Sequence, residues 1–229
     1  MFSINSTLTW SIVICLLLLL GFYAGLYWNR IHWHSRIANS ISGWIRIYCY
    51  VFHGLKHETI TLPQSGAAIV VCNHISGLDP LLLIATVNRP LRFMIAREEY
   101  ERFGLTWLFD KAGCIPVDRG SRPERAMKHA LKALQQGEAI AMFPHGKIIP
   151  RKDTRHAIKA GAIRLAQKAD CAIIPMHLSG VAGKGFTLLA LLLPSRARLK
   201  VYPKFKCPDE SYEKCLQKLA DILNGENND

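Results

Sequence analysis

The first 29 residues carry no charged side chain, and this stretch constrains the fold more than any other feature of the chain. From Leu8 to Trp28 only Thr9 and Ser11 interrupt the apolar run. A helix of that length, at about 1.5 Å per residue, is roughly 31 Å long and can cross the hydrocarbon core of a bilayer. We therefore expect an N-terminal transmembrane anchor over residues 1–29.

The residues around this run indicate both what it is and how it is oriented. A cleaved signal peptide is the alternative to an anchor, but the basic region that precedes such a peptide's apolar core is missing and the run is too long. The positive-inside rule places the N-terminus outside and the bulk of the chain on the cytoplasmic face. The first cations all follow the run: Arg30, Arg36, Arg46 and Lys56.

Residues 30–58 contain an apolar stripe at helical spacing, which predicts an amphipathic helix over 35–53. Such a stripe packs against a protein core or lies along the lipid interface, and the nearby anchor leaves both readings open. The stripe consists of Ile37, Ile41, Trp44, Ile45, Tyr48 and Phe52.

Residues 59–229 alternate strand and helix signals. The pattern predicts a single α/β domain with a central mixed, largely buried sheet flanked by helices. A further apolar run, 188–194, is too short to span a membrane and fits a buried or membrane-dipping segment. The expected strands are 67–72, 91–96, 139–143, 172–176 and 198–205, and the expected helices are 80–86, 122–136, 157–168 and 211–223.

The formal net charge of +12 predicts an anionic partner, either a nucleic acid, an anionic lipid surface or a phosphorylated substrate. The basic segment 147–159 lacks the interleaved aromatic residues that nucleic-acid binding would use. Anionic headgroups or an acidic carrier protein are the better match, and we expect no nucleic-acid partner.

Seven cysteines are scattered along the chain and form no CxxC pair. This distribution argues against a zinc site and against a disulfide framework, and it fits a reducing compartment. We expect these cysteines to be small buried apolar residues, and we expect no metal site.

The strongest candidate for chemistry lies where the strand 67–72 ends. His74 follows that strand, and Asp79 follows His74 by five residues, just before a helix. Ligand sites of α/β sheets lie at the carboxyl ends of strands. A carboxylate on one ring nitrogen would leave the other nitrogen as a general base. Asp79 could instead cap the helix that begins at Pro80.

Asn73-His74, four residues and Asp79 resemble the NHxxxxD signature of the glycerophospholipid acyltransferase family. Three further blocks match in the family's order, and the resemblance covers roughly residues 60–205. These blocks are GCIPVDR at 113–119, FPHGK at 143–147 and IIPM at 173–176.

The resemblance implies direct acyl transfer. His74 would deprotonate an acceptor hydroxyl, Asp79 would orient His74, and the hydroxyl oxygen would attack an acyl thioester. The sequence contains no serine in a GxSxG context, so it does not suggest a covalent acyl-enzyme. The donor would be acyl-CoA or acyl-carrier protein, with no cofactor, and the acceptor a lysophospholipid, first of all 1-acylglycerol-3-phosphate.

The family also implies an acceptor-phosphate site at Arg119 and at Arg97, which follows a strand. Guanidinium groups match phosphate oxygens in a bidentate manner. Gly146 and Lys147 belong to the same expected site. Gly146 allows the close backbone approach that such a loop needs, and Lys147 could contact the phosphate as a point charge. The remaining motif residues are Asn73, Phe143, Pro144, His145 and Pro175.

The chain departs from the family at 145–147, where His145 and Lys147 replace Glu and Thr or Ser, while Gly146 is kept. The change makes the site more positive, which favours a phosphomonoester but also fits a different lysolipid or an aminolipid hydroxyl. A non-catalytic lipid-binding protein is a third reading, although Asn73 and Asp79 are retained. The sequence carries no signal for oligomeric state or acyl-chain length.

Overall fold

The computed structural model describes residues 6–58, 60, 62–118, 120, 123–149, 157–208 and 211–225. Its helices are α1 (Ser6–Trp28), α2 (Arg36–Val51), α3 (Asp79–Thr86), α4 (Arg97–Tyr100), α5 (Thr106–Lys111), α6 (Pro123–Gln135), α7 (Gly161–Lys168), α8 (Leu189–Leu192) and α9 (Tyr212–Asn224). Its strands are β1 (Lys56–His57), β2 (Ala68–Cys72), β3 (Leu91–Ala96), β4 (Ile115–Val117), β5 (Ala139–Met142), β6 (Ala172–Ser179) and β7 (Arg198–Val201).

The strands form one mixed sheet in the order β1-β7-β6-β2-β5-β3-β4. Strands β6, β2, β5, β3 and β4 run parallel to one another, whereas β7 is antiparallel to β6. All five residues of β2 are buried, because β2 lies in the middle of the sheet and both of its faces are covered. The predicted mixed α/β sheet is confirmed.

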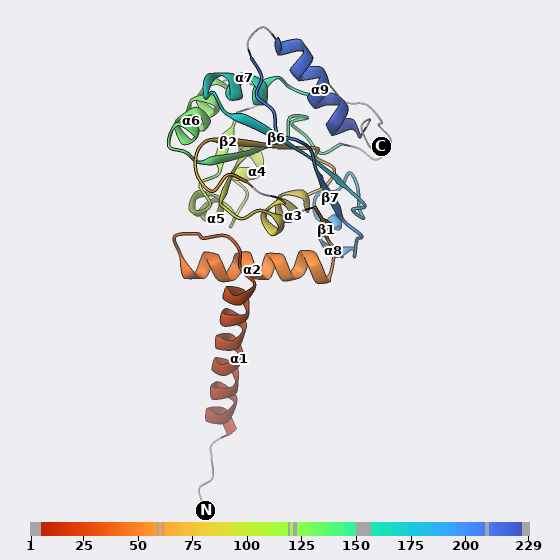
Figure 1. Ribbon diagram of the computed structural model, residues 1–229. Coiled ribbons are helices and arrows are strands. Elements are labelled where there is room, and N and C mark those ends of the chain that lie inside the picture. The colour runs from red at the N-terminus through yellow and green to blue at the C-terminus, as the bar shows by residue number, and fades with distance from the viewer. Residues whose placement is uncertain are drawn as a thin grey trace, which may run out of the picture.

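Two hydrophobic clusters cover the two faces of the sheet. Val70 and Cys72 of β2 point into a cluster that contains residues of α2 and α3, whereas Ile69 and Val71 point into one built with α6, α7 and α9. The alternation follows from the pleat, which sends successive side chains to opposite faces. Figure 1 shows α6, α7 and α9 together on the side of the domain away from α2.

Helix α1 projects away from the domain, and α2 lies across its end, between α1 and the sheet (Figure 1). The two helices touch backbone to backbone. A Cβ built on Gly43 would lie 1.7 Å from the carbonyl oxygen of Gly25, so only glycine fits there. Trp44 Nε1 donates to the Gly21 carbonyl at 2.9 Å, and Ser40 Oγ to the Phe22 carbonyl at 3.0 Å.

Part of the α2 stripe packs against the core, as one of the two readings expects, and its contact with lipid stays a prediction. Ile45 and Tyr48 pack against the core, and Arg46 Nη1 donates to the Ala85 carbonyl of α3 at 2.6 Å. The other side of the helix is exposed and apolar. Its exposed residues are Ile37, Ile41, Trp44 and Val51, followed by Phe52 just after the helix.

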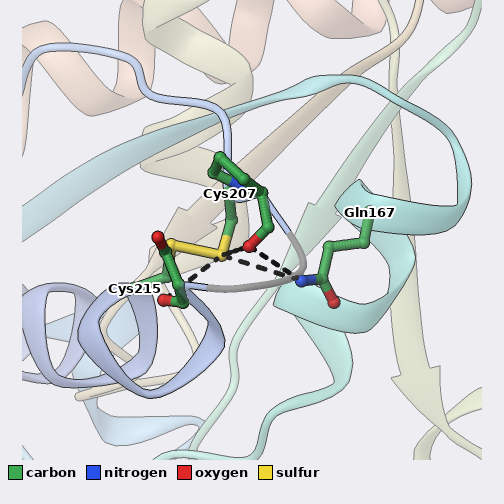
Figure 2. The surroundings of a disulfide bond; sticks show 5 residues. Gln167, Cys207 and Cys215 are labelled. Carbon is green, nitrogen blue, oxygen red and sulfur yellow. Dashed lines mark hydrogen bonds between the residues drawn. A yellow bond between two sulfur atoms is a disulfide. The ribbon is translucent and has the colours of Figure 1, made fainter.

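One cysteine pair contradicts the expectation that the scattered cysteines form no disulfide and are all buried thiols. Cys207, after β7, forms a disulfide with Cys215 of α9 (Figure 2). The two cysteines are eight positions apart without a CxxC pattern, so spacing alone gave no signal for the pair. Gln167 of α7 donates to the Pro208 carbonyl at 3.4 Å beside this bond. The free cysteines are 15, 49, 72, 114 and 171, of which Cys15 is exposed.

Some elements differ from the sequence-based expectation. The sheet begins at β1, three residues before the domain boundary expected at residue 59. Strand β4 has only three residues and helices α4, α5 and α8 are four to six residues long, too short for a periodic signal. Within the apolar run 188–194, Ala190 is buried but Leu188 and Leu192 are exposed, so the run is not a buried segment.

Candidate active site

The site lies where four neighbouring parallel strands end. Val71 of β2 pairs with Met142 of β5, and Ala96 of β3 pairs with Val117 of β4. Since parallel strands end at the same edge, the residues that follow them gather there. These residues are Asn73 and His74 after β2, Phe143 after β5, Arg97 after β3 and Asp118 after β4.

His74 and Asp79 form a hydrogen-bonded pair, as the sequence predicts. His74 Nδ1 lies 2.8 Å from Asp79 Oδ2, and the Asp79 side chain is fully buried while that of His74 is 19% exposed. With Nδ1 held by the carboxylate, the opposite ring nitrogen, Nε2, is left for a substrate proton. This arrangement fixes the ring's tautomer and stabilises an imidazolium when His74 takes a proton.

Asp79 does not act as a helix cap. The N-cap position of α3 is Leu78, without a side-chain cap bond. The carboxylate turns back instead, and accepts the N–H groups of Ile75 and Ser76 at 2.6 and 2.9 Å and the Ser76 hydroxyl at 2.6 Å. These bonds compensate the cost of burying the charge and fix it against His74.

Asn73 joins the ends of β2 and β6. Its Nδ2 donates to the Leu178 carbonyl at 2.9 Å, and its Oδ1 accepts the Leu178 N–H at 2.7 Å. The buried amide thus continues the ladder past the last residue of β2. Asn73 therefore positions His74 through the backbone. Pro175, the last of the predicted motif residues, is buried within β6 opposite Val71.

Phe143 forms one wall of the site. Its ring stacks on the imidazole of His74, with centroids 4.3 Å apart and planes at 19°. The backbone of the same loop also holds His74, because the Ile149 N–H donates to the His74 carbonyl at 2.7 Å. His74 is thus fixed from both sides, by Asp79 and by Phe143.

The 143–147 loop presents cations to the site edge. Pro144 and His145 are buried, and Lys147 is exposed. Gly146 has φ +72°, and a Cβ there would lie 3.0 Å from Nζ of Lys159, whose side chain passes over the glycine. The sequence alone does not predict Lys159 as a site residue, because it lies 13 positions after Gly146 and outside the motif.

Arg97 lies at the edge but is bonded to protein carboxylates. Its guanidinium donates to both oxygens of Asp118, one at 3.0 Å, and Nη1 donates to Glu101 at 3.0 Å. The bond to Asp118 is the first cause that raises the pKa of Arg97 above its usual value. Arg97 thus holds the end of β4. Arg119, the other predicted phosphate ligand, lies outside the described residues.

Cys72 is not a candidate nucleophile, although it lies two positions from His74. Burial, with the charge of Asp79 as a further cause, raises the pKa of its thiol well above the usual value. A buried thiol of that kind stays protonated at neutral pH. Among the described residues, no cluster of three His, Cys, Asp or Glu side chains could hold a metal ion.

Two backbone hydrogen bonds that the sequence does not predict tie the segment after β6 to residues 73–78, which we call the catalytic loop because they carry the candidate base His74. The Gly185 N–H donates to the Ile75 carbonyl at 2.8 Å, and the Gly77 N–H to the Phe186 carbonyl at 3.3 Å. A Cβ on Gly77 would lie 2.3 Å from the Thr187 carbonyl oxygen. Gly77 is therefore required by a partner more than a hundred residues away, which no local pattern reveals.

Known proteins resemble this chain in fold and in sequence. The chain resembles the crystal structure of the 1-acyl-sn-glycerophosphate (LPA) acyltransferase from Thermotoga maritima with a TM-score of 0.64, over 83% of this chain and 79% of that one, at 20% identity. A "Probable 1-acyl-sn-glycerol-3-phosphate acyltransferase" of Mycoplasma genitalium is 31% identical over 200 residues, which are 83% of this chain and 69% of that protein. The 1-acyl-sn-glycerol-3-phosphate acyltransferase of Bacillus subtilis is 22% identical, over 63% of this chain and 67% of that protein.

The family model named Acyltransferase matches residues 55–179. The match begins one residue before β1 and ends at the last residue of β6. It therefore contains His74, Asp79 and the loops that surround them. The chain belongs to the acyltransferase family.

Proposed function

We propose that the protein transfers a fatty acyl group from an acyl thioester to the free hydroxyl of 1-acylglycerol-3-phosphate, which gives phosphatidic acid. The observation that carries the proposal is the His74–Asp79 pair at the strand edge, 2.8 Å apart and stacked on Phe143. The relatives named as 1-acyl-sn-glycerol-3-phosphate acyltransferases support this acceptor.

In the proposed reaction, His74 Nε2 takes the proton of the acceptor hydroxyl as its oxygen attacks the thioester carbon. The C–O bond forms, the C–S bond breaks, and the imidazolium returns the proton to the leaving thiolate. Asp79 keeps Nδ1 protonated and stabilises the charge on the ring. The donor is acyl-CoA or acyl-carrier protein, and no cofactor takes part.

The acceptor phosphate would lie against the cations at the same edge. Lys147 is exposed and Lys159 crosses Gly146 next to it, so this loop offers two ammonium groups. Arg119 is proposed as the principal ligand. Arg97 is bonded to Asp118. It would therefore act by holding the end of β4, or by releasing Asp118 and binding the phosphate in its place.

A different lysolipid or aminolipid hydroxyl is the alternative acceptor. The observation that favours it is the replacement of a carboxylate by the buried His145 and of a hydroxyl by Lys147, next to the proposed phosphate site.

We further propose that α1 anchors the chain in a membrane, with the N-terminus outside and the acyltransferase domain on the cytoplasmic face. Helix α1 is long and apolar enough to cross a bilayer, and it makes close backbone contact with α2. Deletion of residues 1–29 should release much of the protein from membranes in a flotation assay. Unchanged flotation would contradict the anchor.

The acceptor is tested by assaying purified full-length protein against a panel of lysolipids, with acyl-CoA and with acyl-carrier protein as donors. The proposal expects the highest kcat/KM for 1-acylglycerol-3-phosphate. Lys147→Ala should raise the KM for that acceptor and leave the KM for the donor unchanged. Preference for a phosphate-free or diester acceptor would overturn the proposal in favour of the alternative.

A further inference from the structure

Residues 186–193 expose an unusual density of large apolar side chains. Phe186, Leu188, Leu189, Leu192 and Leu193 are between 37% and 73% exposed. Ala190 is fully buried and Leu191 packs on the core, so the short helix α8 is held from inside while its apolar side chains point outward. An exposed apolar patch of this kind marks an interaction surface.

This surface continues onto α2. Tyr48 of α2 donates a hydrogen bond to the Leu191 carbonyl of α8, and Val51 and Phe52, one turn further along, are exposed. Figure 1 shows α8 next to this end of α2, on the side of the domain from which α1 projects. We call this surface the apolar rim; it consists of Val51, Phe52, Phe186, Leu188, Leu189, Leu192 and Leu193.

The segment that carries most of the rim contains charged side chains of one sign only. Residues 171–208 contain six Lys and Arg and no Asp or Glu. One of the six, Lys184, lines a hollow of about 690 Å³ together with Phe186, Leu189 and Leu193. Apolar side chains flanked by cations match a bilayer surface with anionic headgroups, whose charge attracts nearby Lys and Arg.

The rim is coupled to the catalytic loop by the bonds from Gly185 to Ile75 and from Gly77 to Phe186. Ile75 and Gly77 flank Ser76, which bonds Asp79, and Ile75 follows His74 directly. The depth of the rim relative to a bilayer surface would therefore set the depth of His74 as well.

We propose that the apolar rim is a second membrane contact, which inserts into the surface of an anionic bilayer beside α1 and holds His74 at the level of the lipid headgroups. The inference rests on the proposed anchor and lipid acceptor. It adds a role for the rim: a lipid hydroxyl reaches His74 without leaving the bilayer surface.

Insertion is measured with a fluorophore on Leu192→Cys in a Cys15→Ser background, with the full chain reconstituted in vesicles of phosphatidylcholine and phosphatidylglycerol. The same label on Gln135→Cys of α6, which lies away from α1 in Figure 1, is the matched control. Protein without the added cysteine corrects for labelling of native thiols. Quencher-bearing lipids should quench the label at position 192 several-fold more than the label at 135.

Equal quenching at the two positions would overturn the proposal. A spectral shift at position 192 that depends on protein concentration, without quenching by lipid, would also overturn it, because a second copy or a partner protein would then cover the rim.

Activity provides an independent test. The double variant Leu188→Ser/Leu192→Ser should raise the KM for a bilayer-embedded acceptor about tenfold or more, since full burial of even one leucine contributes roughly that factor. Its rate on a short-chain acceptor dissolved as monomers should stay at the wild-type value. The control Leu188→Met/Leu192→Met keeps the apolar surface and should behave as wild type.

Equal losses on both acceptors, or no loss on either, would overturn the role of the rim. A wild-type protein that acylates neither acceptor would instead refute the proposed function, and the quenching comparison would still decide whether the rim enters the bilayer.

Discussion

At the scale of single residues, the site is built around one buried carboxylate. Asp79 accepts four hydrogen bonds, three of them from Ile75 and Ser76, so its position does not depend on His74 alone. His74 in turn is held by Asp79 and by the ring of Phe143. In the proposed reaction, a base fixed on two sides would lose little entropy when it meets the acceptor hydroxyl, which would favour proton transfer.

Asp79→Asn should lower kcat by about 10²–10⁴-fold, because the amide removes the charge that stabilises the imidazolium. Asn keeps the size of Asp and one acceptor oxygen for the Ile75 and Ser76 N–H groups. The circular dichroism spectrum should therefore stay that of the wild type. A kcat within a few-fold of wild type would show that Asp79 serves only the loop.

Gly77→Ala should lower stability by about 1–3 kcal/mol, because the new Cβ would lie 2.3 Å from the Thr187 carbonyl oxygen and the catalytic loop must shift. Gly161→Ala at the start of α7 is the matched control, since its Cβ meets only Met142 Cε at 3.7 Å. Thermal unfolding of both variants measures the difference. Equal melting temperatures would contradict the contact between Gly77 and the segment after β6.

At the scale of elements, glycines and a disulfide fix the outer helices. The α1–α2 crossing depends on Gly25 and Gly43, which let the two backbones touch, as small residues do at helix interfaces in membranes. At the other end of the domain, the disulfide from Cys207 to Cys215 fixes α9 on the sheet face that carries α6 and α7.

Gly43→Ala should separate α1 from α2, since its Cβ would overlap the Gly25 carbonyl. We expect faster proteolysis between the two helices in detergent, measured by the rate at which α1 is released. Gly21→Ala is the control, because its Cβ would lie 3.9 Å from Trp44 and be tolerated. Equal cleavage rates for the two variants would show that the helices do not depend on the close crossing.

Cys215→Ser should lower the free energy of unfolding by about 2–3 kcal/mol relative to the oxidised protein, as expected for a short closed loop. Intact mass under non-reducing conditions should show the loss of two hydrogens in wild type, and thermal unfolding should show the destabilisation. Wild-type protein in which both thiols alkylate without a reductant would contradict the pairing.

At the scale of the whole molecule, the sequence predicts more about the centre of the domain than about its edges. The central strands β2, β3, β5 and β6 are marked by apolar runs, and His74 and Asp79 are close in sequence, so their pairing could be predicted. The Arg97–Asp118 pair could not, because it depends on the parallel register of β3 with the three-residue β4. The same holds for contacts between distant segments, such as Gly77 with Phe186 and Cys207 with Cys215.

Our central proposal is that His74 is the general base that activates an acceptor hydroxyl. The most direct test is single-turnover acyl transfer to 1-acylglycerol-3-phosphate by full-length His74→Ala, in vesicles and next to wild type. We predict a single-turnover rate about 10²–10⁴-fold below that of wild type, with an unchanged thermal unfolding curve. A correctly folded His74→Ala protein that transfers the acyl group within a few-fold of the wild-type rate would contradict the account.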